Sequence, residues 1–314
     1  MFIALKTRKL QLRHPLVTAH GSTTQRNIIE ITASEDGFQG HGEAAPLPGF
    51  GLETFDESLA ALKSWVKSPH RLPDAPAARS GAATAIENLE KATSSTTPTS
   101  GKIAVQALIG SAESSSIESE VSRALEQGYL AIKLKVAAAD KKTDIARIQS
   151  AIQLIGPHSA LRLDANGGWS LEDALYVLSA IDSNHVDLVE EPTANPLDWK
   201  KVREVTGVKI GADEQLTNEL QVHQLLEHAA AQTFVLKPSV IGGPTATRKV
   251  AEIAQRNGVN VLISSFLDGP IALRSARDLA MELAPNEIHG LGTATLFIDE
   301  FPADVVPTNG FLHY

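Results

Sequence analysis

Three acidic side chains each end a short strand-like segment: Asp164, Glu190 and Asp213. Residues 160–164 alternate apolar and polar side chains with the period of two that is typical of a β-strand. The carboxyl ends of parallel strands in an α/β protein meet at one rim, so we expect the three carboxylates to converge there. Converging carboxylates repel one another unless a cation neutralises them, and a hard cation coordinated by oxygen is the usual partner. The sequence therefore predicts a Mg²⁺ site, with Mn²⁺ as an alternative ion.

Lysine side chains flank these acids. Lys133 and Lys135 share one face of the segment 131–136, and Lys237 ends the segment 233–237. Strands of a parallel barrel have no solvent face, because one side meets helices and the other the barrel interior. Both lysines of 131–136 are therefore expected to point inward. Glu191 and Glu214, next to two of the acids, are expected to point aside, into loops or into contacts behind the metal ligands.

The chemistry that suits such a site is removal of a proton next to a carboxylate. This carbon acid is very weak, so a metal and nearby cations must stabilise the enediolate as it forms. A lysine acts as the base only if its pKa falls towards neutrality, which burial beside another ammonium group favours. Lys135 next to Lys133 meets that requirement, and Lys237 can serve the opposite face of the substrate. The alternative is a structural network of buried ion pairs, which is disfavoured because each charge costs several kcal/mol to desolvate.

Strand-like segments must position these residues. From residue 103 onward, short apolar segments alternate with helical ones in steps typical of a βα unit. The segments are 103–109, 131–136, 160–164, 186–190, 208–212, 233–237, 259–263 and 287–290. Eight such units favour a closed (β/α) barrel. An open, doubly wound sheet is the alternative, but no Gly-x-Gly-x-x-Gly motif opens any of its helices.

The first part of the chain has a different pattern. Residues 2–12 and 27–33 are strand-like, and a third strand is expected from Gly37 to Gly42. Between the first two strands, residues 20–26, which include His20 and Arg26, are expected to form a polar loop. Helical patterns follow at 55–67 and 76–92, and a Ser/Thr-rich connection covers 91–102. We therefore expect an α+β capping domain at 1–100, a barrel at 101–295 and a tail at 296–314 that packs with the cap. Alternatively, the connection at 91–102 is a long surface loop within a single domain.

Composition narrows the function classes. The chain has 314 residues, of which 43% are hydrophobic, and a formal net charge of −9 with scattered Lys and Arg, which argues against nucleic-acid and anionic-membrane surfaces. It contains no cysteine, which excludes disulfides and thiolate metal sites. The N-terminus lacks the apolar core of a signal peptide, so we expect a cytoplasmic protein. The expected partner is a small carboxylate substrate, because the acids and lysines suit removal of a proton next to a carboxylate. The sequence does not set the oligomeric state.

The motifs together resemble the enolase superfamily, in its muconate-lactonizing-type branch. They are Lys133-x-Lys135, Asp164-x-Asn166, Glu190-Glu191-Pro192, Asp213-Glu214 and Lys237-Pro238, in that order. The resemblance implies an α/β fold, a (β/α)7β-type TIM barrel with an N-terminal α+β capping domain. It also implies that Asp164, Glu190 and Asp213 ligate Mg²⁺. Lys135 would be the base and then the acid, Lys237 a stabilising cation, and Lys133 a group that biases Lys135 and touches the substrate carboxylate.

Within that branch, segments 42–54 and 161–166 resemble the o-succinylbenzoate synthase family. This likeness implies syn-dehydration of 2-succinyl-6-hydroxy-2,4-cyclohexadiene-1-carboxylate in menaquinone biosynthesis. Dipeptide epimerases and N-acylamino acid racemases share the catalytic set and remain the alternative. Residues 289–294 offer no acid to hold an amine, whereas Asp268, in the segment 264–270 expected to line the pocket, leaves some room for one.

Other expectations concern substrate contacts and other classes of protein. Asn166 and Ser264 are expected to contact substrate, and Arg162 to do so or to serve as a barrel-core ion-pair partner for Asp164 or a neighbouring acid. A binding protein that lost catalysis would be expected to lack a ligand or a base, and none is missing here. A Schiff-base aldolase using Lys237 would not need three converging acids.

Overall fold

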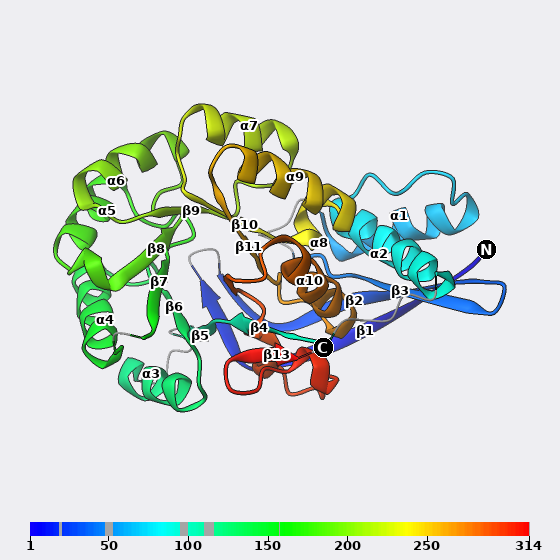
Figure 1. Cartoon of the computed structure of the whole chain (residues 1–314), viewed down its shortest axis with the longest axis horizontal. Helices are drawn as coiled ribbons and strands as arrows, with labels where there is room; N and C mark the ends of the chain where they lie inside the picture. Colours follow the sequence, from blue (N-terminus) through cyan, green and yellow to red (C-terminus); the bar gives the residue numbers. More distant parts are fainter. Residues whose placement is uncertain (19–20, 48–52, 95–99, 110–115, 157, 314) are drawn as a thin grey trace.

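The computed structural model describes the whole chain except residues 19–20, 48–52, 95–99, 110–115, 157 and 314. The N-terminal part is a small antiparallel sheet with two helices, and the remainder is a curled parallel sheet with helices on its outer side (Figure 1). The α/β class and the N-terminal α+β cap expected from the sequence are confirmed. His20 and parts of the expected connections lie outside the described residues.

The capping domain consists of three strands and two helices. Strands β1 (Phe2–Thr18), β2 (Gly21–Glu35) and β3 (Phe38–Ala44) are antiparallel and pair in that order, followed by α1 (Phe55–Lys67) and α2 (Pro76–Thr93). The two helices begin where the sequence predicts. Thr54 starts α1 through a capping box with Glu57, which satisfies two backbone N–H groups at the helix end. Buried Ile29, Ile31 and Leu62 belong to the core between sheet and helices.

The first two strands are longer than predicted. The polar segment 20–26 was expected to be a loop, but β2 begins at Gly21, and Leu16 of β1 pairs with Thr23. The ladder shifts register between Gln11 and Leu16 and then continues. Antiparallel pairing uses backbone groups, so it can extend through polar residues that give no apolar alternation. Arg26 consequently lies within a strand, not in a loop.

Seven parallel strands form the curled sheet, in the order β11-β10-β9-β8-β7-β6-β5. Their bounds are β5 (Ala107–Ile109), β6 (Ala131–Lys135), β7 (Ala160–Asp164), β8 (Val186–Glu190), β9 (Ile210–Ala212), β10 (Thr233–Leu236) and β11 (Asn260–Ile263). The helices are α3 (Ile117–Glu126), α4 (Lys141–Leu154), α5 (Leu171–Ser179), α6 (Trp199–Thr206), α7 (Glu219–Glu227), α8 (Pro238–Ile241), α9 (Pro244–Arg256) and α10 (Pro270–Leu283). Among the described helices, none combines the length and apolarity needed to cross a membrane.

Short strands join the two edges of this sheet. The predicted strand 103–109 is divided into β4 (Lys102–Val105) and β5, and β12 (Ile288–His289) pairs with β4. The backbone next to β12 forms hydrogen bonds to both edges of the sheet. Gly290 N–H donates to Ile263 O at the end of β11, and Gln106 N–H donates to His289 O, both at 2.9 Å. Residues 288–290 thus close the barrel between β11 and β5.

The C-terminal segment contacts both parts of the molecule. Strand β13 (Phe311–His313) pairs with β4, whereas Ile298 N–H donates to Gln11 O of β1 at 2.8 Å. Phe297 is buried with Leu10 and Leu12 of β1. The segment therefore links the capping sheet to the closing strands of the barrel.

His289 is fully buried at this closure. Its Nδ1 accepts from Ile263 N–H, and its Nε2 lies 3.0 Å from Ala284 O. Burial lowers the pKa of His289 from 6.5 to about 4, because a charged imidazolium would lose its hydration. The ring is neutral in the folded protein at neutral pH.

We expect the free energy of unfolding to fall as the pH drops from 6.5 towards 4. In this window the unfolded chain protonates His289 while the folded chain does not, so stability present above pH 6.5 is lost. Urea unfolding at pH 7 and pH 5 should show a wild-type loss that exceeds that of His289→Gln by up to about 2 kcal/mol. Glutamine can keep both hydrogen bonds but cannot titrate, so equal losses in the two proteins would contradict the assignment.

Candidate active site

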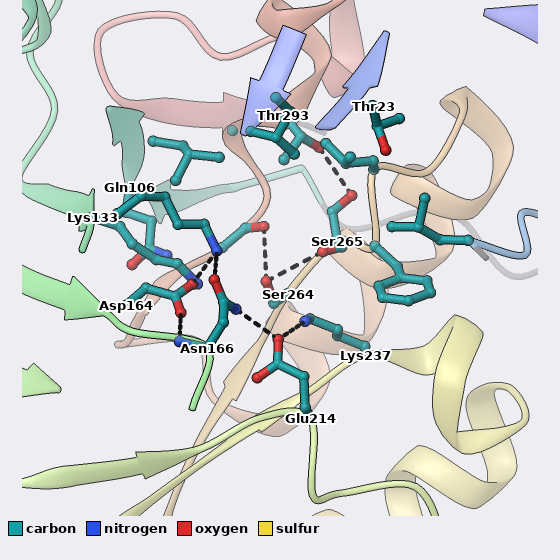
Figure 2. A pocket seen from close by; sticks show the side chains of 18 residues that line it. Thr23, Gln106, Lys133, Asp164, Asn166, Glu214, Lys237, Ser264, Ser265 and Thr293 are labelled. Atoms are coloured by element: carbon teal, nitrogen blue, oxygen red, sulfur yellow. Dashed lines mark hydrogen bonds and ion pairs between the residues drawn. The ribbon is translucent and has the colours of Figure 1, made fainter. Parts of the chain in front are cut away.

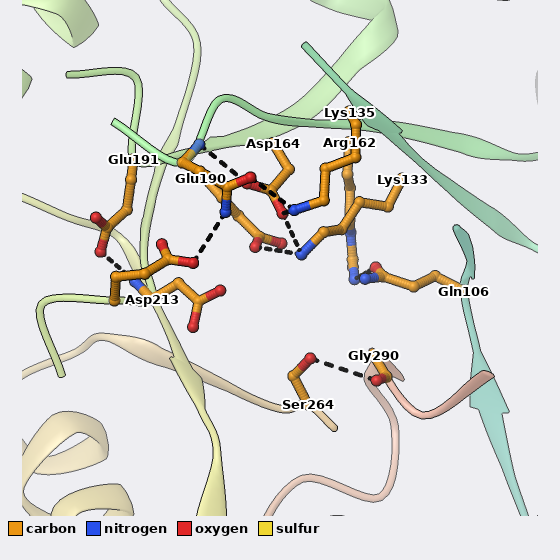
Figure 3. Close-up of polar contacts among 12 residues, drawn as sticks. Gln106, Lys133, Lys135, Arg162, Asp164, Glu190, Glu191, Asp213, Ser264 and Gly290 are labelled. Atoms are coloured by element: carbon orange, nitrogen blue, oxygen red, sulfur yellow. Dashed lines mark hydrogen bonds and ion pairs between the residues drawn. The ribbon is translucent and has the colours of Figure 1, made fainter. Parts of the chain in front are cut away.

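Three carboxylates meet at the mouth of the barrel. Asp164, Glu190 and Asp213 each offer one oxygen, and these oxygens all lie within 4.8 Å of one another. Their side chains come from the ends of β7 and β8 and from the residue after β9 (Figure 3). None of the three residues is more than 3% exposed. The structure therefore brings together the acids that the sequence places at separate strand ends.

Strand register explains this convergence. Asp164 is paired with Lys135 of β6 on one side and with Glu190 of β8 on the other, so the three side chains form one row. Gly211 of β9 continues the row, and Asp213 follows two residues later on the same face. A Cβ on Gly211 would lie 3.2 Å from Cγ of Glu190, so glycine leaves room for that carboxylate.

The strand β6 shows the predicted alternation. Every residue from Ala131 to Lys135 is buried, with Ile132 and Leu134 in the main hydrophobic core. Lys133 and Lys135 point the other way, towards the carboxylates (Figure 3). The two amines share Oδ2 of Asp164, at 2.7 Å each.

Each lysine also has a second polar partner. Lys133 Nζ lies 2.6 Å from Oε2 of Glu190, and Lys135 Nζ lies 2.7 Å from Oδ1 of Asn166. Across the site, Lys237 Nζ lies 2.7 Å from Oδ2 of Asp213 and 3.7 Å from Oε1 of Glu214. The amines thus flank the acids on both sides, as expected.

For Lys133 and Asp164, burial and the opposite charges of neighbouring side chains shift the pKa in opposite directions. Burial and the neighbouring Glu214 raise the pKa of Asp213 to about 7, although Lys237 opposes the shift. Burial alone would raise the pKa of Asp164, but Lys133 and Lys135 outweigh it and hold that pKa below its usual range. Burial would lower the pKa of Lys133, yet the surrounding carboxylates raise it well above its ordinary value. Lys133 and Asp164 therefore favour each other's charged forms, whereas the charged form of Asp213 is disfavoured until further positive charge is supplied.

The donor set fits a divalent metal. Oε1 of Glu190 and Oδ1 of Asp213 are buried and have no hydrogen-bond partner among the described residues. A buried carboxylate oxygen without a partner is costly, and a bound cation would satisfy it. The available ligands are all oxygens, which suits Mg²⁺ or Mn²⁺ better than softer metals. An ion-pair network alone accounts for the lysine contacts but not for these two oxygens.

Glu191 orients the third acid. Its carboxylate accepts hydrogen bonds from the N–H groups of Asp213 and Gln215 at 2.9 and 2.8 Å. The φ of Glu191 is 40°, a left-handed conformation that turns its side chain away from the row of Glu190. It therefore lies beside the site, as the sequence predicts. Glu214 instead lines the pocket and accepts from Nδ2 of Asn166 at 2.9 Å.

A pocket extends from the acids and amines towards the capping domain (Figure 2). Its far wall carries the hydroxyl groups of Thr23, Ser264, Ser265 and Thr293. Apolar side chains complete the lining: Leu16, Leu47, Leu108, Phe266 and Leu267. Such a pocket can hold a small molecule whose carboxylate lies at the metal end.

The expected substrate contacts fall into two groups. Asn166 and Ser264 line the pocket, and Ser264 Oγ donates to Gly290 O at 3.3 Å. Arg162 lies in the barrel interior and is not among the residues that line the pocket. Its guanidinium donates to Asp187 Oδ2 at 2.8 Å, Ile288 O at 2.7 Å and Gln106 Oε1 at 2.9 Å. The ion-pair interpretation of Arg162 therefore describes its contacts, with Asp187 as the partner in place of Asp164.

Asp268 is also unavailable to a ligand. It is 1% exposed, accepts hydrogen bonds from Ser239 Oγ and Phe266 N–H, and is not among the lining residues. The segment 264–270 contributes Ser264 to Leu267 to the lining, as expected, whereas Gln106 and Thr293 were not predicted as pocket residues. Both follow short strands at the barrel closure that carry none of the acid and lysine motifs.

Comparisons with known proteins agree with this geometry. A family model described as enolase C-terminal domain-like matches residues 116–313. An o-succinylbenzoate synthase from Vibrio cholerae is 30% identical over 303 residues, covering 92% of this chain and 88% of that protein.

Solved structures share the fold. A substrate-liganded L-Ala-D/L-Glu epimerase from Bacillus subtilis has a TM-score of 0.88 at 22% identity, covering 99% of this chain and 95% of that one. A dipeptide epimerase from Enterococcus faecalis, complexed with Mg and a dipeptide, has a TM-score of 0.86 at 19% identity, covering 99% of both chains. With a family match over most of its length and the acid and lysine rows in place, this chain belongs to the enolase superfamily.

Proposed function

We propose that this protein is an o-succinylbenzoate synthase, a Mg²⁺-dependent lyase that dehydrates a succinyl-hydroxycyclohexadiene carboxylate in cytoplasmic menaquinone biosynthesis. The observation that carries the proposal is the combination of lysines on both sides of a carboxylate triad with a far pocket wall of hydroxyl and apolar groups. The Vibrio cholerae relative, which bears this name and matches nearly the whole chain, supports it.

Asp164, Glu190 and Asp213 would hold the metal ion. When bound there, the ion supplies positive charge that stabilises the negative charge developing on the substrate carboxylate. The two unpartnered oxygens of Glu190 and Asp213 are the groups of this chain best placed to bind it.

Lys135 would move the proton. As a free amine it takes the proton from the carbon next to the carboxylate, and it then returns that proton to the departing hydroxyl, which leaves as water. One group suffices because both bonds break on the same face in a syn elimination. Asn166 accepts from Lys135 Nζ at 2.7 Å and so fixes the direction of the amine. Lys133 shares Oδ2 of Asp164 with Lys135, so the two amines lie beside the same carboxylate oxygen at the metal end of the pocket.

Lys237 would act as a fixed cation on the opposite side. Attraction to Asp213 and Glu214 outweighs the effect of burial and raises the pKa of Lys237 above its ordinary value, so it stays charged at neutral pH. A permanently charged ammonium stabilises developing negative charge but exchanges protons poorly.

The pocket favours an anionic or neutral far end on the substrate. The carboxylates among the described lining residues are Asp164, which contacts both lysines, and Glu214, which contacts Asn166 and Lys237. The described residues of the far wall offer hydroxyl groups and no carboxylate to pair with an ammonium group. A succinyl carboxylate could accept hydrogen bonds there.

The second candidate is racemisation or epimerisation of an acylated amino acid or dipeptide. Similarity of fold to the Bacillus subtilis epimerase favours it, as does the presence of Lys237 across the site from Lys135. This reaction requires both lysines to exchange protons, one on each face of the substrate.

Replacing Lys135 should abolish the lyase reaction without removing the metal. We expect Lys135→Ala to lower kcat by roughly three orders of magnitude, because a general acid–base group typically contributes a factor of about 10²–10⁴. Turnover is followed spectrophotometrically and Mg²⁺ binding by calorimetry. The exposed Lys200→Ala is the matched control. Wild-type protein that binds Mg²⁺ but does not turn over this substrate would exclude the proposed reaction.

Deuterium exchange separates the two candidates. In D₂O, an epimerase or racemase should introduce deuterium at the α-carbon of an N-acylated amino acid or dipeptide, and Lys237→Ala should block exchange from one face. We expect the wild-type enzyme to dehydrate the cyclohexadiene substrate faster, judged by kcat/KM, than it exchanges any such compound. The reverse order would favour the second candidate.

Metal affinity should depend on pH through Asp213. Because the pKa of Asp213 is raised to about 7, protons compete with the metal for this ligand below that pH. We expect Mg²⁺ affinity, measured by calorimetry, to fall by up to about tenfold per pH unit below 7. Asp213→Asn should weaken binding throughout, whereas the surface variant Glu219→Gln should leave it unchanged. Constant affinity across this pH range would contradict the role given to Asp213.

A further inference from the structure

The loop that follows β11, residues 264–269, forms one wall of the pocket. Its residues Ser264, Ser265, Phe266 and Leu267 all line the cavity. The loop belongs to the barrel by sequence, yet side chains of the capping strands hold much of its backbone. Those side chains are Arg26 of β2 and Glu43 of β3.

Arg26 bonds to two pocket walls at once. Its side chain is buried, with the residue 2% exposed, and its guanidinium donates to Leu267 O at 3.1 Å and Phe266 O at 3.2 Å. It also donates to Pro46 O at 2.7 Å and Ala45 O at 2.5 Å, just before the pocket residue Leu47. One planar group with five N–H donors thus fixes the barrel loop relative to the cap segment.

Glu43 caps a helix of the barrel. Its carboxylate accepts from Gly269 N–H at 2.6 Å and from Ile271 N–H at 3.2 Å, at the beginning of α10. Gly269, the N-cap residue, has no side chain to do this, and a Cβ there would lie 2.5 Å from Oε2 of Glu43. The orphan amides at the start of α10 are therefore satisfied by the capping domain.

Asp268 continues the network inside the loop. It accepts from Ser239 Oγ at 2.8 Å, two residues after Lys237, and its N–H donates to Ser265 Oγ at 3.1 Å. Leu267, next to it, has a φ of 55°, a strained conformation for a residue with a branched side chain. That backbone turn presents carbonyl groups to Arg26. The loop conformation is thus held by contacts from outside the loop.

This arrangement is expensive in free energy. Burial and the nearby Asp268 raise the pKa of Glu43 to about 8, and burial lowers the pKa of Arg26 to about 10. Replacing buried charged groups by apolar ones is often neutral or stabilising in proteins. Fold stability alone therefore explains this set of buried charges poorly, whereas the need to hold the loop 264–269 in one position explains it well.

We propose that Arg26 and Glu43 are positioning residues that fix the pocket loop 264–269 against the capping domain and so determine how tightly substrate is bound. The kinetic part of this inference rests on the proposed function. The structural part does not, because it concerns the order of the loop in the substrate-free protein.

Hydrogen exchange of the full-length protein tests the structural part. In Arg26→Lys and Glu43→Gln we expect amides of residues 265–272, including Gly269 and Ile271, to exchange at least about tenfold faster than in the wild type. Amides of 186–190 in β8 should keep their protection. The control variants are Arg8→Lys and Glu30→Gln, which alter an ion pair of the same capping sheet that does not contact the loop.

Steady-state kinetics tests the consequence, with whichever of the two candidate substrates the wild-type enzyme turns over. We expect KM to rise at least about tenfold in Arg26→Lys and Glu43→Gln while kcat changes less than about threefold, because the proton-transfer groups are untouched. Arg26→Lys retains the positive charge and Glu43→Gln retains one acceptor oxygen, so both changes are mild enough for folding to be checked by thermal unfolding. Mg²⁺ affinity should match that of the wild type.

Two results would overturn the inference. One is unchanged exchange at 265–272 together with an unchanged KM. The other is faster exchange spread evenly over β1–β3 with kinetic constants unchanged per folded molecule, which indicates a purely structural role. If the wild type dehydrates nothing, the proposed function fails, and the exchange pattern still decides whether the loop is held from the cap.

Discussion

Mutual repulsion among three buried carboxylates is the constraint on which this structure depends. Asp164, Glu190 and Asp213 present oxygens within 4.8 Å of one another in a site almost closed to water. Such an arrangement persists only if positive charge surrounds it. Three lysines provide part of that charge, and two oxygens of these acids have no hydrogen-bond partner in the described part of the chain, which a metal would satisfy. The fold supplies the geometry, because parallel strands in register deliver acids and amines to the same rim.

The acids and lysines could be predicted from sequence because they obey a simple rule. Alternation fixes which face a strand residue occupies, and the end of a parallel strand fixes the rim. Lys133, Lys135, Asp164 and Glu190 follow that rule without exception. Two other pocket residues, Gln106 and Thr293, do not, because they follow short strands at the barrel closure. There β4 and β5 are separate, and no strand is long enough for alternation to extend beyond two to four residues. Pocket walls of this kind depend on loop conformation, which local sequence does not encode.

Arg162 shows a different limit of sequence reasoning. Alternation correctly places it on the inner face of β7, where Leu188, Val235 and Leu262 form a small apolar layer. Its partner could not be anticipated, because the ladder between β7 and β8 shifts register after Leu161 and Asp187 is left without a paired residue. That irregularity lets Asp187 reach the guanidinium of Arg162. The lengths predicted for the first two strands of the cap were too short for a similar reason, since β1 and β2 continue through polar residues beyond a break in register.

The contact of Glu43 with the start of α10 has a consequence for how such enzymes can be recombined. A barrel helix whose first amides are satisfied from a remote strand is incomplete when that strand is exchanged. A chimera that joins this barrel to a foreign cap would inherit an open helix end and an unsupported loop unless the donor carries an acid and a guanidinium at matching places. A unit exchanged between relatives must therefore include both the carboxylate acceptor of the capping domain and the helix amides of the barrel that donate to it.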